Sequence, residues 1–259
     1  MKTTPRKLGW IPSIPDIRDK KYARPLALKL ASLPVSVRLP MVPMPLDQGN
    51  LGSCVSNAVA NAVNFCRQRQ HALNAFHPSR LFNYYVSREQ KGWQDFDSGD
   101  YVRDSIKVVN SHGSLPEDEW AYDVAKFRER PPEWCYTSAE RNKSVEYLRL
   151  DLPGFDSQGR ILQIKTCLAE GFPVVIGFAI YSNFPWGDPN GEVMMPQAGD
   201  YTMGGHAVLI VGYDDGANRY SFLNSWGQPW GKLGRGTLPY EYLGEQGLSS
   251  DHWTIRSVI

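Results

Sequence analysis

The sequence has few cysteines and no long apolar run. Only four of its 259 residues are cysteine, too few at this length for a disulfide scaffold. No stretch approaches the roughly 18 consecutive apolar residues that a membrane-spanning helix needs, so no membrane contact is predicted. The net charge is only +1, which gives no electrostatic reason to expect nucleic acid or an anionic membrane as a partner.

The first residues also lack a secretory pattern. They are basic but contain no apolar run, whereas a Sec-type signal peptide needs about seven apolar residues in succession. We therefore expect a protein that is cytoplasmic or exported by another route. No two cysteines lie close together with histidines nearby, so neither a zinc site nor another metal or organic cofactor is predicted.

Proline is concentrated in residues 1–45, which contain eight prolines. That density excludes long helices and central strands from the segment. The same segment carries more large apolar residues than a solvated linker does, namely Leu8, Trp10, Ile11, Ile14 and Ile17. We expect an extended arm that lies over a folded body formed by residues 46–259.

The body divides into a helical first part and a strand-rich second part. Helices are predicted where apolar residues recur every three or four positions, in 54–69, 79–89, 97–113 and 161–169. Strands are predicted for short β-branched and aromatic runs, in 173–181, 206–214 and 220–226, with a hairpin loop at 214–218. This segregation favours an α+β fold of two lobes, mainly helical over about 46–160 and mainly β over about 161–259.

Cys54 stands at an abrupt change of composition. It follows the turn-forming residues of 49–53 and opens the predicted helix 54–69. A cysteine nucleophile needs a lowered pKa, because the thiolate attacks, and a helix N-terminus or a neighbouring imidazolium lowers it. Cys66, on the apolar face of the same helix, is expected to be a buried packing residue. Cys135 and Cys167 are compatible with a disulfide or with two thiols.

Three polar residues complement the thiol. His206 opens a predicted strand directly after two glycines, and Asn224 lies in a strand-like run, where asparagine is disfavoured unless it makes a specific hydrogen bond. An asparagine carbonyl can orient an imidazole so that its other nitrogen faces a thiol. The amide of Gln48, six residues before Cys54, can stabilise an oxyanion together with the N–H of Cys54.

The segments DQGNLGSCVSNA, GGHAVLIVGYDD and YSFLNSWGQPWG resemble the three signature blocks of papain-like cysteine peptidases, in the family's order. The resemblance implies a papain-like two-lobed fold, with the active site in a cleft between a helical lobe and an antiparallel β lobe. It implies an endopeptidase that acts on extended polypeptides. Cys54 matches the nucleophile, His206 the general base, Asn224 the orienting residue and Gln48 the oxyanion donor.

The resemblance also implies which residues contact the substrate: Gly99, Tyr101, Gly177, Gly205, Ala207 and Trp226. Trp226 matches the tryptophan that shields the Asn–His hydrogen bond from water. The small Gly177 and Ala207 suggest a roomy pocket for a bulky apolar side chain. The family's first cysteine is replaced here by Leu51 and its aromatic residue by Val55, so the family disulfide at Leu51 is absent.

The arm, residues 1–45, resembles the short N-terminal extensions of bacterial family members. We expect it to cover part of the cleft and inhibit the enzyme, as the pro-segment of a monomeric zymogen. Two alternatives remain open. The same triad could catalyse deamidation or transamidation of a protein substrate, or the chain could be a binding module with a decayed active site.

Overall fold

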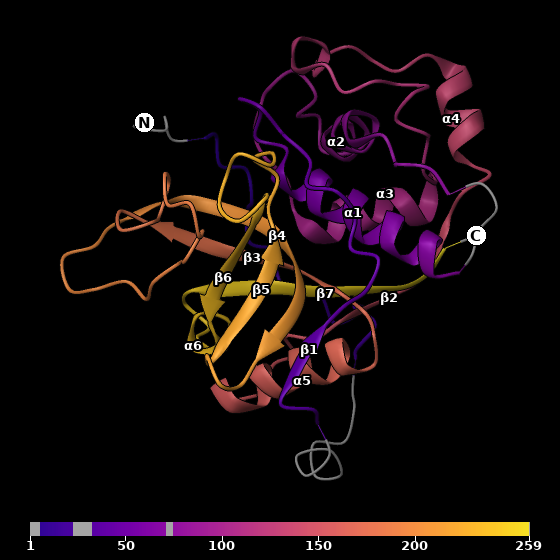
Figure 1. Ribbon diagram of the computed structural model, residues 1–259. Coiled ribbons are helices and arrows are strands. Elements are labelled where there is room, and N and C mark those ends of the chain that lie inside the picture. Colours follow the sequence, from indigo (N-terminus) through magenta and orange to yellow (C-terminus); the bar gives the residue numbers. More distant parts are fainter. Residues whose placement is uncertain (1–5, 23–32, 71–74, 259) are drawn as a thin grey trace.

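The computed structural model describes residues 6–22, 33–70 and 75–258. A group of helices stands over a twisted antiparallel sheet (Figure 1). The helices of the described residues are α1 (Cys54–Arg69), α2 (Arg80–Glu89), α3 (Val102–Ser111), the 3₁₀-helix η2 (Val124–Lys126), α4 (Glu133–Ala139), α5 (Ser157–Ala169) and α6 (Tyr240–Gly244). The strands are β1 (Ser36–Arg38), β2 (Ser144–Arg149), β3 (Val174–Tyr181), β4 (Thr202–Asp214), β5 (Arg219–Leu223), β6 (Arg235–Pro239) and β7 (Ser249–Val258).

The described strands form one sheet in the order β2-β7-β3-β4-β5-β6, and β1 pairs with β4. Every pairing is antiparallel. Helices α1 to α4 lie on one side of the sheet, whereas α5 and α6 lie near its opposite end (Figure 1). The predicted α+β class is confirmed. No helix of the described residues is long and apolar enough to cross a membrane.

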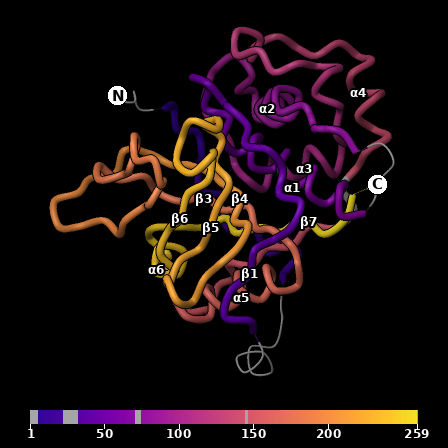
Figure 2. Tube along the Cα trace, in the orientation of Figure 1, coloured from indigo at the N-terminus to yellow at the C-terminus, as the bar shows by residue number. Residues whose placement is uncertain are grey.

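Helix α1 forms the contact between the helices and the sheet. It packs on β4 and β7, and its residues Val55, Val59 and Val63 share one buried cluster with Leu209 of β4 and Trp253 of β7. The first residue of α1 is Cys54, which belongs to the same cluster. The thiol therefore lies where the two halves of the molecule meet. The chain approaches α1 by rising from β1 past the sheet to the helices (Figure 2).

The predicted helices are present, with two starts misplaced. Helix α3 begins at Val102, five residues after the start of the predicted segment 97–113. Ser79 caps α2, its hydroxyl accepting the N–H of Phe82 at 3.1 Å, and the positive φ of Gly113 follows the end of α3. Helix α5 begins at Ser157, four residues before the predicted start. Asp156 caps it by accepting the N–H of Gly159 at 2.7 Å, so Gly159 lies in the capped first turn.

The predicted strands are also present, but the last one extends too far. Strand β5 ends at Leu223, so the prediction of a strand through Trp226 is wrong. The backbone N–H of Asn224 bonds to the carbonyl of Gly234, and its side-chain oxygen accepts the N–H of Ser225 at 2.8 Å. These bonds turn the chain out of the ladder. Asn224 is thus a residue of a turn rather than an exception within a strand.

Two expectations about side chains had different outcomes. Cys66 is buried and its thiol donates to the carbonyl of Ile255 at 3.0 Å, as predicted. Cys135 and Cys167 lie in different buried clusters, and no disulfide is present among the described residues. In the arm, Trp10 is buried, but Ile14 and Ile17 are 75% and 92% exposed. Of these three residues, the arm therefore buries Trp10 but leaves Ile14 and Ile17 in solvent.

Candidate active site

Cys54 begins α1 and His206 lies on β4, two elements that pack against each other. Both residues are fully buried. The backbones of Ala207, the residue after His206, and of Gly9 in the arm lie close enough to Cys54 to act on the pKa of its thiol. The packing of the helix N-terminus on the strand thus brings the Cys54 thiol near the backbone of the residue after His206, although the cysteine and the histidine lie 152 positions apart (206 − 54) in the sequence.

The His206 ring is fixed on three sides. Its Nε2 donates to Oδ1 of Asn224 at 2.8 Å, since a carbonyl oxygen can only accept. The ring stacks on Trp226, with centroids 4.6 Å apart and planes 28° apart, and meets Phe178 edge to face at 5.9 Å. Within the described part of the chain, Nδ1 is buried without a hydrogen-bond partner. The ring is oriented with one nitrogen unengaged.

Gln48 is held by the segment that carries Asn224. Its side-chain oxygen accepts the hydroxyl of Ser225 at 2.7 Å, and its backbone N–H bonds to the Ser225 carbonyl at 2.8 Å. The side-chain amide nitrogen consequently faces the turn before α1. It donates to the carbonyl of Leu51 at 2.7 Å and to the carbonyl of Lys7, in the arm, at 3.0 Å.

Burial keeps the thiol and the imidazole uncharged. It raises the pKa of Cys54 to about 11, against the opposing effect of the N–H groups of Ala207, Gly9, Val55 and Cys54 itself. Burial also lowers the pKa of His206 to about 4, against the opposing effect of the hydrogen bond to Asn224. With the arm in place, the site therefore disfavours the thiolate–imidazolium pair.

The low pKa of His206 predicts a loss of stability in acid. In the unfolded chain this histidine binds a proton near its ordinary pKa of 6.5, whereas in the folded chain its pKa is about 4. The contribution is therefore lost as pH falls, by about 2 kcal/mol between pH 7 and pH 5. Urea unfolding at both pH values should show that the stability of His206→Gln falls less than that of the wild type. Equal losses would contradict the assignment.

The arm runs through the groove beside this site. The N–H groups of Gly9 and Trp10 both bond to the carbonyl of Gly205, at 3.1 and 3.0 Å. On the other wall, the N–H of Asp100 bonds to the Gly9 carbonyl at 2.8 Å, and the N–H of Ile11 to the Asp100 carbonyl at 3.0 Å. This is a parallel β-bridge between Trp10 and Asp100. The backbone of the arm thus joins the helical half to the sheet.

The indole of Trp10 fills a pocket whose walls are glycines. A Cβ added at Gly177 or at Gly205 would overlap the indole ring. Ala207, the register partner of Gly177, belongs to the same buried cluster as Trp10. The indole nitrogen donates to Oδ2 of Asp251 at 3.1 Å. The structure therefore brings together the predicted pocket residues, with an aromatic residue of the chain itself between them.

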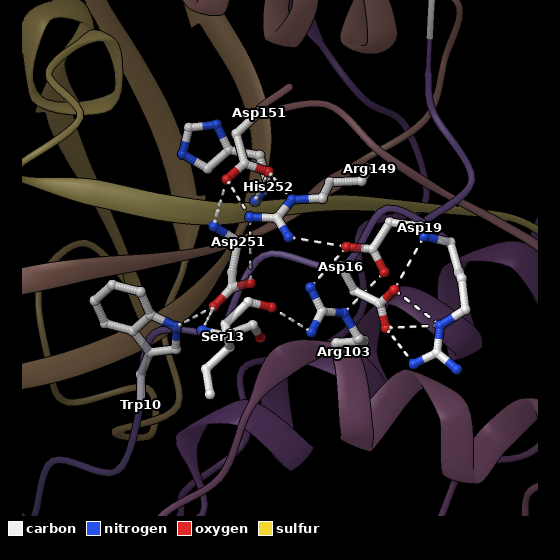
Figure 3. Close-up of polar contacts among 11 residues, drawn as sticks. Trp10, Ser13, Asp16, Asp19, Arg103, Arg149, Asp151, Asp251 and His252 are labelled. Atoms are coloured by element: carbon white, nitrogen blue, oxygen red, sulfur yellow. Dashed lines mark hydrogen bonds and ion pairs between the residues drawn. The ribbon is translucent and has the colours of Figure 1, made fainter. Parts of the chain in front are cut away.

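Further along, an ionic cluster anchors the arm (Figure 3). Asp251 also accepts the N–H of Ser13 at 2.7 Å. Asp19 pairs with Arg103 of α3 at 2.6 Å and with Arg149 of β2 at 2.9 Å. These side chains are at most about a tenth exposed, so the pairs are shielded from solvent far better than surface ion pairs are.

The remaining predicted substrate residues lie on the cleft wall formed by residues 97–101. Gly99 has φ +78° and lies against Gly9, where a Cβ would meet the arm's carbonyl. The backbone that pairs with the arm is that of Asp100 rather than Gly99. The ring of Tyr101 turns toward Trp93, with centroids 5.9 Å apart. The residue that pairs with the arm is therefore one position after the predicted Gly99. The shift arises because the positive φ of Gly99 directs the backbone N–H and carbonyl of Asp100 into the groove.

The sequence analysis missed one side chain of this wall, Asp97. Its carboxylate accepts the N–H of Gly52 at 3.0 Å and the hydroxyl of Tyr84 at 2.5 Å, and pairs with Lys7 of the arm at 2.6 Å. It connects the turn before Cys54 to the cleft wall, close to where Leu51 replaces the family cysteine. Only its place in the motif DSGD, next to Gly99, could have drawn attention to it.

This architecture, with a cysteine at a helix start, a histidine on β4 and an asparagine just after β5, is that of a thiol-dependent hydrolase of a known class. The chain belongs to the papain family of cysteine proteases, whose family model matches residues 37–242. Its structure is similar to that of xylellain, a cysteine protease from Xylella fastidiosa, with a TM-score of 0.88 and 36% identity over 99% of both chains.

Two curated proteins are also similar in sequence. An uncharacterized peptidase C1-like protein of Acanthamoeba polyphaga mimivirus is 38% identical over 99% of this chain and 88% of that protein. A cathepsin B-like protein of Giardia intestinalis, CP3, is 36% identical over 74% of this chain and 63% of its own length. The predicted family and the predicted papain-like fold are confirmed.

Proposed function

We propose that this protein hydrolyses peptide bonds through a thioester on Cys54, with His206 as general base and acid. The observation that carries the proposal is the His206 ring, held by Asn224 at 2.8 Å and stacked on Trp226 at 4.6 Å, with Nδ1 buried and unengaged. A ring fixed in this way presents one nitrogen to one reactant, which is what proton transfer from a thiol requires.

The reaction needs only groups of this chain, the peptide and water. The Cys54 proton passes to Nδ1 of His206, and the thiolate sulfur bonds to the substrate carbonyl carbon. The C–N bond then breaks, and His206 gives its proton to the leaving amine. Finally His206 takes a proton from water, the hydroxide displaces the thiolate from the thioester, and the acid product leaves with the thiol restored.

The support for Gln48 as oxyanion donor is its present hydrogen bond to a peptide carbonyl. Its amide nitrogen donates to the Lys7 carbonyl at 3.0 Å, and Ser225 holds the opposite end of that amide. The N–H groups at the first turn of α1, those of Cys54 and Val55, already direct positive potential at the thiol. A developing oxyanion at the Lys7 carbonyl position would meet the Gln48 amide.

Gln48→Ala tests this donor. We expect kcat for peptide hydrolysis to fall by about 10² to 10³, because one preorganised oxyanion donor is lost, with a smaller change in KM. Steady-state kinetics with a fluorogenic peptide measure both constants. Gln48→Glu is the matched control for size, and its negative charge should lower kcat at least as far. An unchanged kcat in Gln48→Ala would remove Gln48 from the reaction.

The reaction type is tested by following the acyl group. The test uses the full-length chain carrying Gly9→Ala, because a methyl group at that position overlaps the Gly52 carbonyl and displaces the arm. Peptides are incubated in ¹⁸O-water with and without an added primary amine, and products are identified by mass spectrometry. Cleaved peptides with one ¹⁸O in the new carboxylate support hydrolysis. Intact glutaminyl peptides bearing the amine, or converted to glutamate, would favour transamidation or deamidation instead.

We further propose that residues 1–45 act as an autoinhibitory pro-segment of a chain that works as a monomer. The support comes from residues 6–22. Gly9 lies over the nucleophile, Trp10 fills the pocket between Gly177 and Gly205, and Asp19 anchors the segment through two arginines. A substrate needs the same backbone groups and the same pocket, so arm and substrate exclude each other.

A further inference from the structure

The backbone carbonyl of Gln48 is held by a residue that the proposed mechanism does not use. The hydroxyl of Tyr122, in the loop between α3 and η2, donates to this carbonyl at 2.9 Å. The backbone N–H and the side-chain oxygen of Gln48 are both bound to Ser225. The proposed oxyanion donor is thus fixed from two directions, by Ser225 after strand β5 and by Tyr122 among the helices.

The same phenol oxygen reaches the residue before the nucleophile. It lies 2.5 Å from the hydroxyl oxygen of Ser53. Because the single proton of the phenol is donated to the Gln48 carbonyl, the Ser53 hydroxyl is the donor in this second bond. Burial raises the pKa of Tyr122 to about 12, so the phenol keeps its proton at neutral pH. One side chain therefore connects the residue of the oxyanion donor to the residue that precedes Cys54.

Arg80 of α2 holds the Tyr122 ring in place. Its guanidinium carbon lies over the ring, 3.8 Å from the ring centroid. The guanidinium also donates to the carbonyl of Asp47 at 3.0 Å and to the side-chain oxygen of Asn57 at 2.9 Å. A bidentate pair with Glu117, at 2.6 and 2.8 Å, fixes its orientation. A planar group with several bonds thus supports the ring from a helix.

Asn57 joins this network to the helix of the nucleophile. From the first turn of α1 its amide donates to the carbonyl of Ser53 at 2.8 Å and to the hydroxyl of Ser53 at 3.1 Å. Gln48, Ser53 and Asn57 are fully buried. Loss of one partner of a buried hydrogen bond leaves the other unsatisfied, which costs more than the bond itself contributes. The turn 48–53 therefore depends on these contacts for its position.

We infer that Tyr122 holds the Gln48 amide in the position that oxyanion binding requires, and is thus a positioning residue of the reaction. The inference rests on the proposed function and deepens it, because Tyr122 acts through Gln48. No disulfide holds the turn 48–53, since all four cysteines are free. A small displacement of a catalytic group lowers the rate strongly, because the alignment of reacting groups is itself part of catalysis.

Tyr122→Phe in the full-length Gly9→Ala protein removes only the hydroxyl. We expect kcat for a fluorogenic peptide to fall by about tenfold, whereas KM changes by less than about twofold. Tyr220→Phe is the matched control, because Tyr220 is fully buried and its hydroxyl donates to the carbonyl of Ile161, on α5, at 3.0 Å. Its kcat should stay unchanged. Equal kcat values for Tyr122→Phe and Tyr220→Phe overturn the inference.

A double-mutant cycle distinguishes positioning from general destabilisation. If Tyr122 acts by holding Gln48, its hydroxyl has no donor left to position in Gln48→Ala. We therefore expect Tyr122→Phe to lower kcat by less than about twofold in the Gln48→Ala, Gly9→Ala protein. Losses that multiply overturn the inference. Should Tyr122→Phe fail to fold, Arg80→Lys takes its place in the cycle with the same expected outcomes, because it keeps the charge and loses the planar group that stacks on the ring.

Reversible binding separates this inference from the proposed function. If no peptide is hydrolysed, the proposed function fails, and the position of Gln48 is then measured with acetyl-tryptophanyl-glycinal, a peptide aldehyde. The Cys54 thiol adds across the aldehyde C=O, its sulfur bonding to carbon and its proton moving to oxygen. That oxygen then accepts from the Gln48 amide. The matching peptide alcohol cannot form the bond to sulfur and reports binding of the peptide alone.

Calorimetry gives the dissociation constants of the aldehyde and the alcohol. In the Gly9→Ala protein the alcohol should bind about a hundredfold more weakly than the aldehyde, and only about tenfold more weakly once Tyr122→Phe is added. Tyr220→Phe should leave the ratio unchanged. A ratio near one before Tyr122 is replaced, or a ratio that Tyr122→Phe does not alter, overturns the inference whatever the result with peptides.

Discussion

Replacing Cys54 by alanine in the full-length Gly9→Ala protein is expected to lower kcat for peptide hydrolysis by about 10⁴-fold or more. The thiol forms the covalent bond in the proposed mechanism, and the backbone N–H groups of the first turn of α1 act on that thiol. Removal of a nucleophile leaves only the contribution of binding and of the oxyanion donors. Initial rates with a fluorogenic peptide at saturating concentration measure the effect.

The matched control is Cys66→Ala, which removes a thiol from the same helix. Cys66 packs in the same buried cluster as Cys54, and its thiol donates to the Ile255 carbonyl. Its loss should reduce stability by about 1 kcal/mol or more through the cavity left behind, while peptide hydrolysis continues. Equal activity of Cys54→Ala and Cys66→Ala would contradict the proposed nucleophile. Thermal unfolding curves verify that both variants are folded.

Replacing Gly9 by alanine is expected to raise peptide hydrolysis by about tenfold to a hundredfold relative to the wild type. A Cβ at this position overlaps the carbonyl of Gly52, and backbone atoms cannot move aside as the end of a flexible side chain can. Overpacking of this kind costs about 1 to 3 kcal/mol. It destabilises only the state in which the arm covers the groove. The fraction of molecules in which the arm has left the groove therefore rises, and kcat/KM rises with that fraction.

Two measurements check the Gly9→Ala prediction. Rates of peptide hydrolysis report the open groove, and rates of Cys54 alkylation by iodoacetamide report access to the thiol. Both should rise together. Gly216→Ala, in the exposed loop between β4 and β5, introduces the same methyl group away from the arm. The autoinhibitory role of the arm fails if Gly9→Ala, though folded, shows no gain over Gly216→Ala in either rate.

The proposed catalytic residues could be predicted from the sequence because each carries a local signal. Cys54 follows a turn and opens a helix, His206 follows two glycines, and Gln48 lies within the same short block as the cysteine. The turn conformation and the helix start depend mainly on neighbouring residues, so local reasoning suffices for them. Asn224 was identified for the right bond but in the wrong element, since the strand ends one residue earlier.

The lining of the groove could not be predicted in the same way. Asp97, Asp100 and Asp251 gain their partners from the arm, about 90 to 240 positions away in the sequence, and no local pattern encodes such pairings. Ile14 and Ile17 were misjudged for a related reason. Their hydrophobicity suggested burial, but the ion pairs of Asp19 rather than apolar contacts fix that part of the arm.

The position of Asp19 has a consequence for how the arm can be removed. One carboxylate joins Arg103, on the helical side, to Arg149, on the sheet, and so forms a non-covalent cross-link across the molecule. A cut between Trp10 and Asp19 would release the part of the arm that lies in the groove and retain this cross-link. Removal of everything before residue 23 would free the groove and abolish it. The buried Arg103 guanidinium would then lose Asp19 as its counter-ion, whereas Arg149 would keep Asp151. Maturation by a cut within the arm would thus yield a more stable enzyme than complete removal of the arm would.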